Sequence, residues 1–142
     1  MINEDFVRGI SIVKDKNGSD FFYTLIYGKQ KVGEIKISEL SKDNIYHLFS
    51  YYPFLEDYLK RTSPIYQISN YGIDNLMRNK GYGKYLLDEV INDFGKYTLI
   101  LQAGSSNNRM SQEDLVRMYE RNGFKVLNGY REYACFMIRK PD

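Results

Sequence analysis

One seven-residue segment of this 142-residue chain contains three cationic residues and two glycines. The segment consists of Arg78, Asn79, Lys80, Gly81, Tyr82, Gly83 and Lys84. Apolar residues at helical spacing follow it, so the segment lies at the start of a helix. A helix N-terminus leaves backbone N–H groups without intrahelical partners and carries about half a positive charge. Because glycines have no Cβ atom, a bulky anion can approach those N–H groups closely. The segment therefore predicts a phosphate or pyrophosphate site.

Two common phosphate-binding motifs do not fit these residues. A Walker A loop requires Ser or Thr after its Gly-Lys pair, whereas Gly83-Lys84 is followed by Tyr85 and no glycine precedes it at the required spacing. A dinucleotide-binding fingerprint requires a third glycine three residues after the second, and that position is Leu86. The comparison argues against nucleoside triphosphates and NAD as ligands.

The elements that must position this segment can be predicted from hydrophobic periodicity. Strands are expected at 6–13, 21–27, 31–37, 65–73, 97–103, 124–127 and 133–139. Turns are expected at Asn17-Gly18, within a polar connection over 14–20, at 28–30, and at Asn128-Gly129. The strand at 97–103 has the apolar run of a strand that is buried on both faces.

Helices are expected in three places. The first covers 43–60 and is broken by Pro53. The second runs from about Gly81 to 94, with Gly95 at a left-handed C-terminal cap. The third is capped by Ser111, has an acidic residue three positions later, and ends at Gly123. The order of elements predicts an α/β (α+β) fold with a mixed sheet, a βαβ unit at its centre, and a single domain over 1–142.

Composition restricts the class of protein. Lys and Arg number 20 against 18 Asp and Glu, a balance that gives no support to a nucleic-acid partner, so none is expected. One cysteine, Cys135, cannot close an internal disulfide, and one histidine, His47, cannot build a His-based metal site, so no metal is expected. No apolar run is long enough for a membrane span or a signal peptide. We expect a cytoplasmic domain with no membrane partner, in which Cys135 is a small buried residue.

Two motifs in register resemble those of the GNAT superfamily of N-acetyltransferases. Arg78-x-x-Gly81-x-Gly83 resembles the superfamily's acetyl-CoA pyrophosphate loop, and the segment 115–124 resembles its Leu-Tyr-Glu-Lys-x-Gly-Phe motif. The resemblance covers residues 65–139. It implies a mostly antiparallel central sheet with a splayed parallel strand pair and flanking helices. It also implies acetyl-CoA as the cosubstrate.

The resemblance assigns roles to individual residues. Ile73 and Asn75 would offer backbone groups to pantetheine, and residues 78–84 would hold the pyrophosphate. Gln112 stands where the superfamily usually has a cofactor-binding Asn, with Asn107 and Asn108 as substitutes. Tyr119 stands at the position of the superfamily's usual general acid. A phenol with a pKa near 10 and a thiol with a pKa near 8.5 differ by only about 1.5 units, so a hydrogen bond from the phenol can support the thiolate leaving group.

The general base and the acceptor are less well defined by the sequence. Glu34, on the third strand, is the first candidate for the base, and a water relay to Gln67 or Ser69 is equally open. His47 is a further candidate for contacting the substrate. The expected reaction is direct attack of a primary amine, in a protein or a small molecule, on acetyl-CoA in a ternary complex.

Two other functions remain open at this stage. One is a non-catalytic acyl-CoA-binding module that acts through a protein partner, and the other is transfer of a longer acyl group. The resemblance also implies that a homodimer can form, with the Tyr- and Phe-rich segment 46–58 as its interface.

Overall fold

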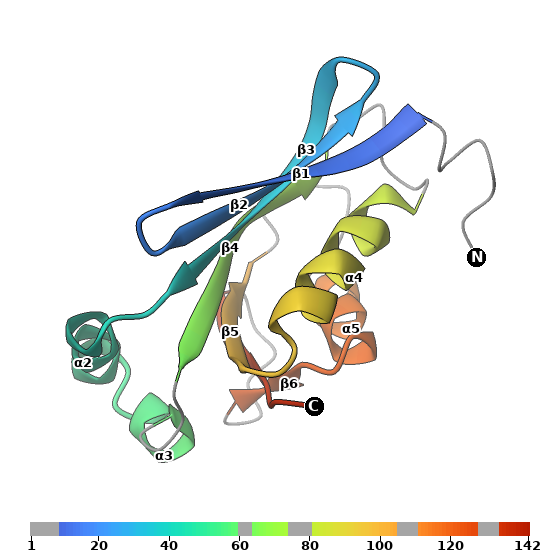
Figure 1. Ribbon diagram of the computed structural model, residues 1–142. Helices are drawn as coiled ribbons and strands as arrows, with labels where there is room; N and C mark the ends of the chain where they lie inside the picture. The colour runs from blue at the N-terminus through green and yellow to red at the C-terminus, as the bar shows by residue number, and fades with distance from the viewer. Residues whose placement is uncertain (1–8, 60–63, 74–80, 105–110, 128–133) are drawn as a thin grey trace. The chain divides into compact units, whose positions relative to one another are not determined.

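The computed structural model describes residues 9–59, 64–73, 81–104, 111–127 and 134–142 (Figure 1). Its contacts divide the chain into two compact units, each described by itself below. Unit 1 comprises Met1–Ser38 and Ile68–Asp93, and unit 2 comprises Glu39–Gln67 and Phe94–Asp142. Whether the chain behaves as a single domain stays a prediction.

Seven strands form one mixed sheet in the order β1-β2-β3-β4-β5-β7-β6. They are β1 (Ile10–Asn17), β2 (Asp20–Tyr27), β3 (Gln30–Glu39), β4 (Ile65–Ile73), β5 (Thr98–Ala103), β6 (Lys125–Val126) and β7 (Cys135–Arg139). The described helices are α2 (Lys42–Tyr51), α3 (Leu55–Leu59), α4 (Tyr82–Phe94) and α5 (Gln112–Arg121). The β4–β5 pair is parallel, whereas β1–β2, β2–β3, β5–β7 and β6–β7 are antiparallel. The predicted mixed, mostly antiparallel fold is confirmed, and the splay of the parallel pair stays a prediction.

The first hairpin is tighter than the sequence suggests. Residues 14–17, which were expected in a loop, continue β1, and the ladder runs to the pair Asn17↔Asp20. Only Gly18 and Ser19 remain for the turn, and Gly18 has φ 63°, as in a type II′ turn. The polar side chains of this part of β1 are exposed, so hydrophobic alternation could not reveal the strand.

A β-bulge interrupts the pairing of β2 with β3. Leu25 pairs with Gly33 and Ile26 pairs with Lys31, so Val32 is an extra residue on β3. Val32 and Gly33 are both buried, whereas their neighbours Lys31 and Glu34 are not. The bulge therefore shifts the alternation of β3 by one residue within the strand.

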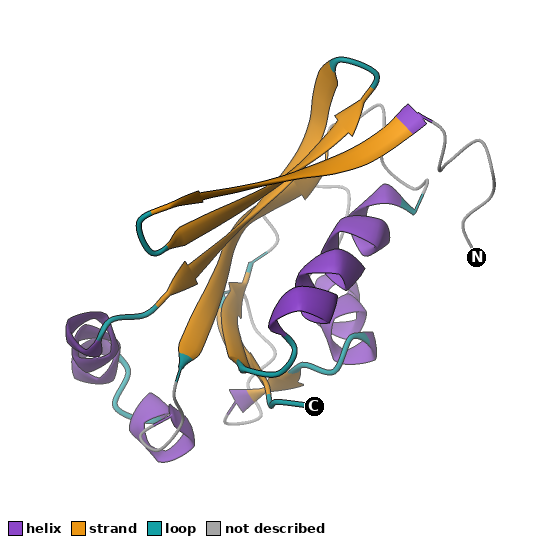
Figure 2. Ribbon diagram, in the orientation of Figure 1, coloured by secondary structure: helices purple, strands orange, loops and turns teal. Residues whose placement is uncertain are grey.

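In unit 1, α4 packs along the β1–β3 ribbon (Figure 2). Within unit 1, the buried residues of α4 are Tyr82, Leu86, Leu87 and Val90. At the C-terminal end of α4, Asp93 accepts a hydrogen bond from the Tyr23 hydroxyl and forms an ion pair with Lys14 at 2.8 Å. Burial and this hydrogen bond raise the pKa of Tyr23, so the hydroxyl keeps its proton and remains a donor.

In unit 2, the start of β4 pairs in parallel with β5 through Ile65, Tyr66 and Gln67. Thr98 to Leu101 of β5 are buried, which confirms a strand covered on both faces. Helices α2 and α3 are separated at Pro53, as its missing N–H predicts. The core of this unit consists of Leu55, Leu59, Ile65, Ile100, Leu127, Phe136 and Ile138.

Of the three helix ends predicted at Ser111, Gly123 and Gly95, the structure confirms the first two. The Ser111 side chain accepts a hydrogen bond from the backbone N–H of Asp114 at 3.1 Å, and Gly123, with φ 93°, follows the end of α5. The expected left-handed cap at Gly95 is wrong, because Gly95 does not have a positive φ. Its carbonyl instead accepts a hydrogen bond from the backbone N–H of Asp142 at 2.9 Å. Contact with the distant C-terminus thus replaces the local cap.

The last two strands pair as predicted, with Lys125 opposite Ile138 and Val126 opposite Met137. The turn expected at Asn128-Gly129 lies outside the described residues. So do residues 6–8, at the expected beginning of the first strand.

Close approach of β3 to β4 depends on the absence of a side chain at Gly33. A Cβ atom there would lie 2.5 Å from Ile73 Cδ1 and 3.1 Å from the Gly72 carbonyl oxygen. We predict that Gly33→Ala lowers the free energy of unfolding by about 1–3 kcal/mol, because the added methyl overpacks the junction. Gly72→Ala is the matched control, since a Cβ at Gly72 would meet open space. Urea denaturation of both variants measures the difference, and equal effects would contradict the packing account.

Candidate functional site

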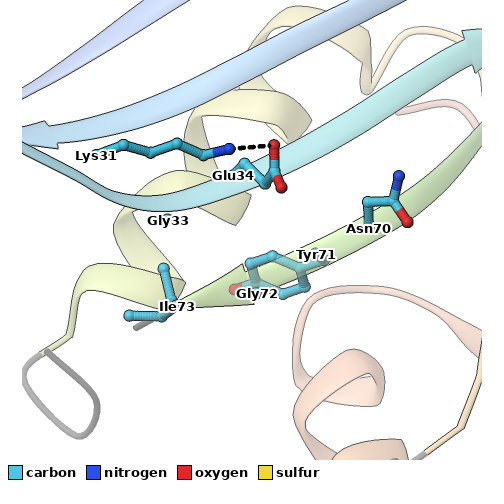
Figure 3. Close-up of a pocket in the computed structure, with 7 residues that line it drawn as sticks. All are labelled: Lys31, Gly33, Glu34, Asn70, Tyr71, Gly72 and Ile73. Atoms are coloured by element: carbon cyan, nitrogen blue, oxygen red, sulfur yellow. Dashed lines mark hydrogen bonds and ion pairs between the residues drawn. The ribbon is translucent and has the colours of Figure 1, made fainter. Parts of the chain in front are cut away.

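An open groove of about 600 Å³ lies in unit 1 between β3 and the end of β4 (Figure 3). Its described lining consists of Lys31, Gly33, Glu34, Asn70, Tyr71, Gly72 and Ile73. Lys31 and Glu34 come from β3 and form an ion pair at 2.8 Å. The groove therefore brings Glu34, the first candidate for the base, together with Ile73, a predicted cofactor residue.

The end of β4 has an irregular backbone and is bonded to the start of α4. Asn70 has φ 52°, a left-handed conformation that Asn tolerates better than most residues. The next residue, Tyr71, donates its hydroxyl hydrogen to the Gly83 carbonyl in the first turn of α4. A Cβ at Gly83 would lie 3.1 Å from the Tyr71 hydroxyl oxygen and 3.6 Å from Ile73 Cγ1. Gly83 therefore allows α4 to approach β4 closely.

The N-terminus of α4 has the electrostatics of an anion site. Gly81 has φ +84° and accepts the first helical hydrogen bond from the Tyr85 N–H at 3.0 Å. The first turn holds no acidic residue but holds Lys84, whereas α2 and α5 have acidic residues in their first turns. A cation there opposes the helix dipole. Lys84 is exposed and pairs with Asp88 at 3.1 Å, a contact worth little at the surface.

The structure describes only part of the predicted phosphate segment. Gly81 and Lys84 are exposed, and Gly83 is half-buried. Tyr82 is buried and belongs to the core-facing side of α4, so its side chain packs inward. Asn75, Arg78, Asn79 and Lys80 lie outside the described residues, as do Asn107 and Asn108.

In unit 2, Gln112 connects the start of α5 to the end of β5. Its side-chain Nε2 donates a hydrogen bond to the Ala103 carbonyl at 2.9 Å and lies 3.8 Å from Cys135 Sγ. This contact gives Gln112 a structural role, and its role in cofactor binding stays a prediction. Cys135 is buried, as expected, and forms no disulfide.

Tyr119, also in unit 2, is 7% exposed on the inner face of α5. Its ring meets Phe124 edge-on, with the ring centroids 5.7 Å apart. Burial raises the pKa of Tyr119 to about 12. The phenol is therefore protonated across the physiological pH range and can donate a hydrogen bond, and its general-acid role stays a prediction.

Lys31, Asn70 and Tyr71 are groove residues that the motifs in the sequence do not indicate. The sequence does hold one signal of the groove: Asn70 and Gly72 are turn-forming residues within a strand. Such residues mark an irregular backbone or a place where a ligand or another backbone comes close. Of the other candidates, His47 is exposed on α2, and Gln67 and Ser69 are half-buried on β4.

Two features are absent from the described part of the chain. None of its helices is long and apolar enough to span a membrane. Within the same residues, no group of three or more His, Cys, Asp and Glu side chains is placed to hold a metal ion.

Comparison with known proteins bears on the fold. No protein-family model and no curated protein matches the sequence, whereas solved structures do match. One is a GNAT family acetyltransferase from Elizabethkingia anophelis with acetyl-CoA bound, which is 14% identical with a TM-score of 0.63. That match covers 94% of this chain and 99% of the other. This chain has the GNAT fold.

The GNAT fold of this chain is also similar to two further structures. PH1933 from Pyrococcus horikoshii is 23% identical with a TM-score of 0.59, and the match covers 85% of this chain and 65% of PH1933. Naa50 from Arabidopsis thaliana, solved with the bisubstrate analogue CoA-Ac-MVNAL, is 17% identical with a TM-score of 0.54. That match covers 82% of this chain and 70% of Naa50. The fold implied by the two sequence motifs is thus confirmed.

Burial of Tyr119 predicts a loss of stability at alkaline pH. Between about pH 10 and 12 an unfolded chain releases this phenol proton while the folded chain keeps it, so unfolding becomes easier as the pH rises. The contribution is complete below about pH 10 and is worth up to about 3 kcal/mol. We expect the free energy of unfolding to fall more steeply in the wild type than in Tyr119→Phe from pH 9.5 to 11.5. Parallel curves would show that Tyr119 is not buried as described.

Proposed function

We propose that the protein is an N-acetyltransferase that moves an acetyl group from acetyl-CoA to a primary amine. The observation that carries the proposal is the arrangement of unit 1. Glu34 and Ile73 share one groove, and the Tyr71–Gly83 hydrogen bond holds the groove's strand against the glycine-rich start of α4. The structurally similar E. anophelis protein has acetyl-CoA bound, and Naa50 was solved with a CoA–peptide analogue, which supports this choice.

We assign the cofactor roles along one stretch of chain. Ile73 ends β4 and offers backbone groups to pantetheine, with Asn75 as the second partner. The pyrophosphate binds to the N–H groups at the start of α4 and to the nearby cations, so that residues 78–84 act together. Gln112 contributes an amide from α5. Gly81 suits this role, because the space where its Cβ atom would stand is open.

In the proposed reaction the acceptor binds as an ammonium ion and first gives one proton to Glu34. The neutral nitrogen attacks the thioester carbonyl carbon, and the new N–C bond forms as the C–S bond breaks. CoA leaves with the electron pair of the C–S bond as a thiolate, and the second proton, which the acylated nitrogen loses, protonates this thiolate. The products are the N-acetylated amine and CoA, with no covalent enzyme intermediate. Enzyme, acetyl-CoA and amine therefore form a ternary complex.

Tyr119 assists departure of the thiolate by hydrogen bonding in this proposal. Because burial raises its pKa to about 12, complete proton transfer to a thiolate with a pKa near 8.5 is uphill by about 5 kcal/mol. A donor that keeps its proton still stabilises the charge that develops on sulfur. The general-acid role is thus carried mainly by the hydrogen bond.

Glu34 fits the role of base by position. Its carboxylate is about half exposed in the groove wall, where an incoming ammonium can reach it. Lys31 lies beside it in the groove wall and forms an ion pair with it at 2.8 Å. A water relay through Gln67 or Ser69 is the alternative route for the proton.

The acceptor belongs to the class of primary amines, on a protein lysine, a protein N-terminus or a small molecule. We place the protein in the cytoplasm, since a single cysteine cannot close an internal disulfide. A homodimer stays a prediction, and Tyr46 and Tyr51 of α2, each 79% exposed, offer apolar surface for it.

The direct test incubates purified protein with acetyl-CoA and a panel of amines and lysine peptides, and follows release of the CoA thiol. Amine-dependent release above the rate of spontaneous hydrolysis supports the transferase. Binding of acetyl-CoA without release from any amine favours the non-catalytic acyl-CoA-binding module. Thiol release only from acyl-CoA molecules with longer acyl chains favours the second alternative, transfer of a longer acyl group.

We predict that Gly81→Trp abolishes acetyl-CoA binding, because the indole would occupy the space through which a phosphate reaches the N–H groups of α4. Gly81→Ala is the control, since it bears the same backbone strain at φ +84° without the bulk. Isothermal titration calorimetry measures both affinities. Equal affinity for the two variants would show that no ligand approaches Gly81.

We predict that Tyr119→Phe lowers kcat by roughly 100-fold, the effect of losing one proton-donating group, and leaves the Kd for acetyl-CoA within about twofold of the wild-type value. Tyr46→Phe, on the exposed face of α2, is the matched control and should retain full activity. Steady-state thiol release together with calorimetry separates kcat from binding. An unchanged kcat in Tyr119→Phe would remove this residue from the mechanism.

A further inference from the structure

The groove in unit 1 carries a feature that the acetyl transfer itself does not require. Lys31 and Glu34 place opposite charges side by side in its wall, 2.8 Å apart (Figure 3). We infer that the groove binds an acceptor whose amine lies next to a carboxylate, with Lys31 binding the carboxylate and Glu34 the ammonium. This inference rests on the proposed function and narrows its acceptor to a small zwitterionic amine.

The charge pair is built by the β-bulge at Val32. In a regular strand, residues three apart point to opposite faces, so Lys31 and Glu34 could not meet. The extra residue at Val32 shifts the alternation by one, which puts both side chains on the face opposite buried Val32 and Gly33. A bulge of this kind re-aims side chains, and here it aims a cation and an anion into the same groove.

Charge balance argues against an acceptor that is only cationic. The described lining of the groove holds one cation and one anion, so their charges cancel. A polyamine bound at Glu34 would place its ammonium beside Lys31, and the two like charges would repel. A zwitterion removes that conflict, because its carboxylate faces Lys31 while its ammonium faces Glu34. The two side chains are 54% and 45% exposed, so their own ion pair is weak and a ligand can replace it.

The spacing of the charges selects the size of the acceptor. Because the Lys31 Nζ and Glu34 Oε2 atoms are only 2.8 Å apart, the complementary charges of the ligand must also be close together. An α- or β-amino acid has its ammonium and carboxylate one or two carbons apart. The side-chain amine of a lysine within a protein has no carboxylate of its own at that distance. The geometry therefore favours a free amino acid over a protein lysine.

The test uses acceptors in matched sets: phenylalanine, its methyl ester and phenethylamine, with an equivalent set built on leucine. The twenty common amino acids, spermidine and a lysine peptide complete the panel. Thiol release from acetyl-CoA gives kcat/KM for each acceptor. We expect at least one free amino acid to react, and in its set to exceed both the ester and the decarboxylated amine by about tenfold or more, equivalent to 1.4 kcal/mol.

Substitution of Lys31 tests the cause of that preference. Lys31→Gln should remove the preference for the carboxylate, and Lys31→Glu should reverse it in favour of the ester and the plain amine. Lys29→Gln, in the exposed β2–β3 turn outside the groove lining, is the control and should keep the wild-type preference. A wild-type enzyme that prefers the ester, spermidine or the lysine peptide overturns the inference and leaves the transferase intact. A preference for the carboxylate that persists in Lys31→Glu also overturns the inference, because Lys31 would then not be its cause.

A binding measurement separates this inference from the proposed function. Calorimetric titration with the same amino acids, with and without CoA, reports on the groove independently of turnover. Binding that Lys31→Glu abolishes supports the groove assignment, even if acetyl-CoA does not bind and the transferase proposal fails. If no amino acid binds and none is acetylated, the inference is wrong.

Discussion

The arrangement of β3, β4 and α4 in unit 1 depends on how closely the backbone of α4 approaches that of β4. The Tyr71 hydroxyl is bonded to the Gly83 carbonyl, and Gly33 and Gly83 have no side chain where β3, β4 and α4 come closest. Each of these contacts is short range, so a displacement of one element moves the others. The same contacts place the N–H groups at the start of α4 beside the end of β4. The contacts that pack β4 against α4 therefore also position the N–H groups that are proposed to bind acetyl-CoA.

Much of the fold could be predicted from the sequence, because apolar periodicity and a few turn residues carry it. The bounds of β4, the break at Pro53 and the cap at Ser111 match the structure, since each has a strong local cause. The bulge at Val32 and the carbonyl contact of Gly95 have no local cause in the sequence. They arise from pairing with β2 and from contact with the C-terminus, which periodicity does not report. The groove was missed for the same reason, and only Glu34 and Ile73 of its residues were predicted.

Two groups proposed for the chemistry occupy different environments, and the environments suit different roles. Tyr119 is buried, so it keeps its proton and can act only as a donor at neutral pH. Glu34 is about half exposed beside Lys31, so the ammonium group of an acceptor can reach its carboxylate. Different environments of two ionisable groups are a general way to divide acid and base roles between two residues.

The central claim is that the start of α4 binds the phosphates of acetyl-CoA, and calorimetric titration of the purified protein with acetyl-CoA and then with CoA tests it most directly. The account predicts saturable binding of both ligands at one site. It also predicts that affinity falls as salt concentration rises, because charged phosphates meet cations and a helix dipole. No heat of binding with either ligand, supported by an unchanged melting temperature in their presence, would contradict the account and reduce the glycine-rich segment to an ordinary helix start.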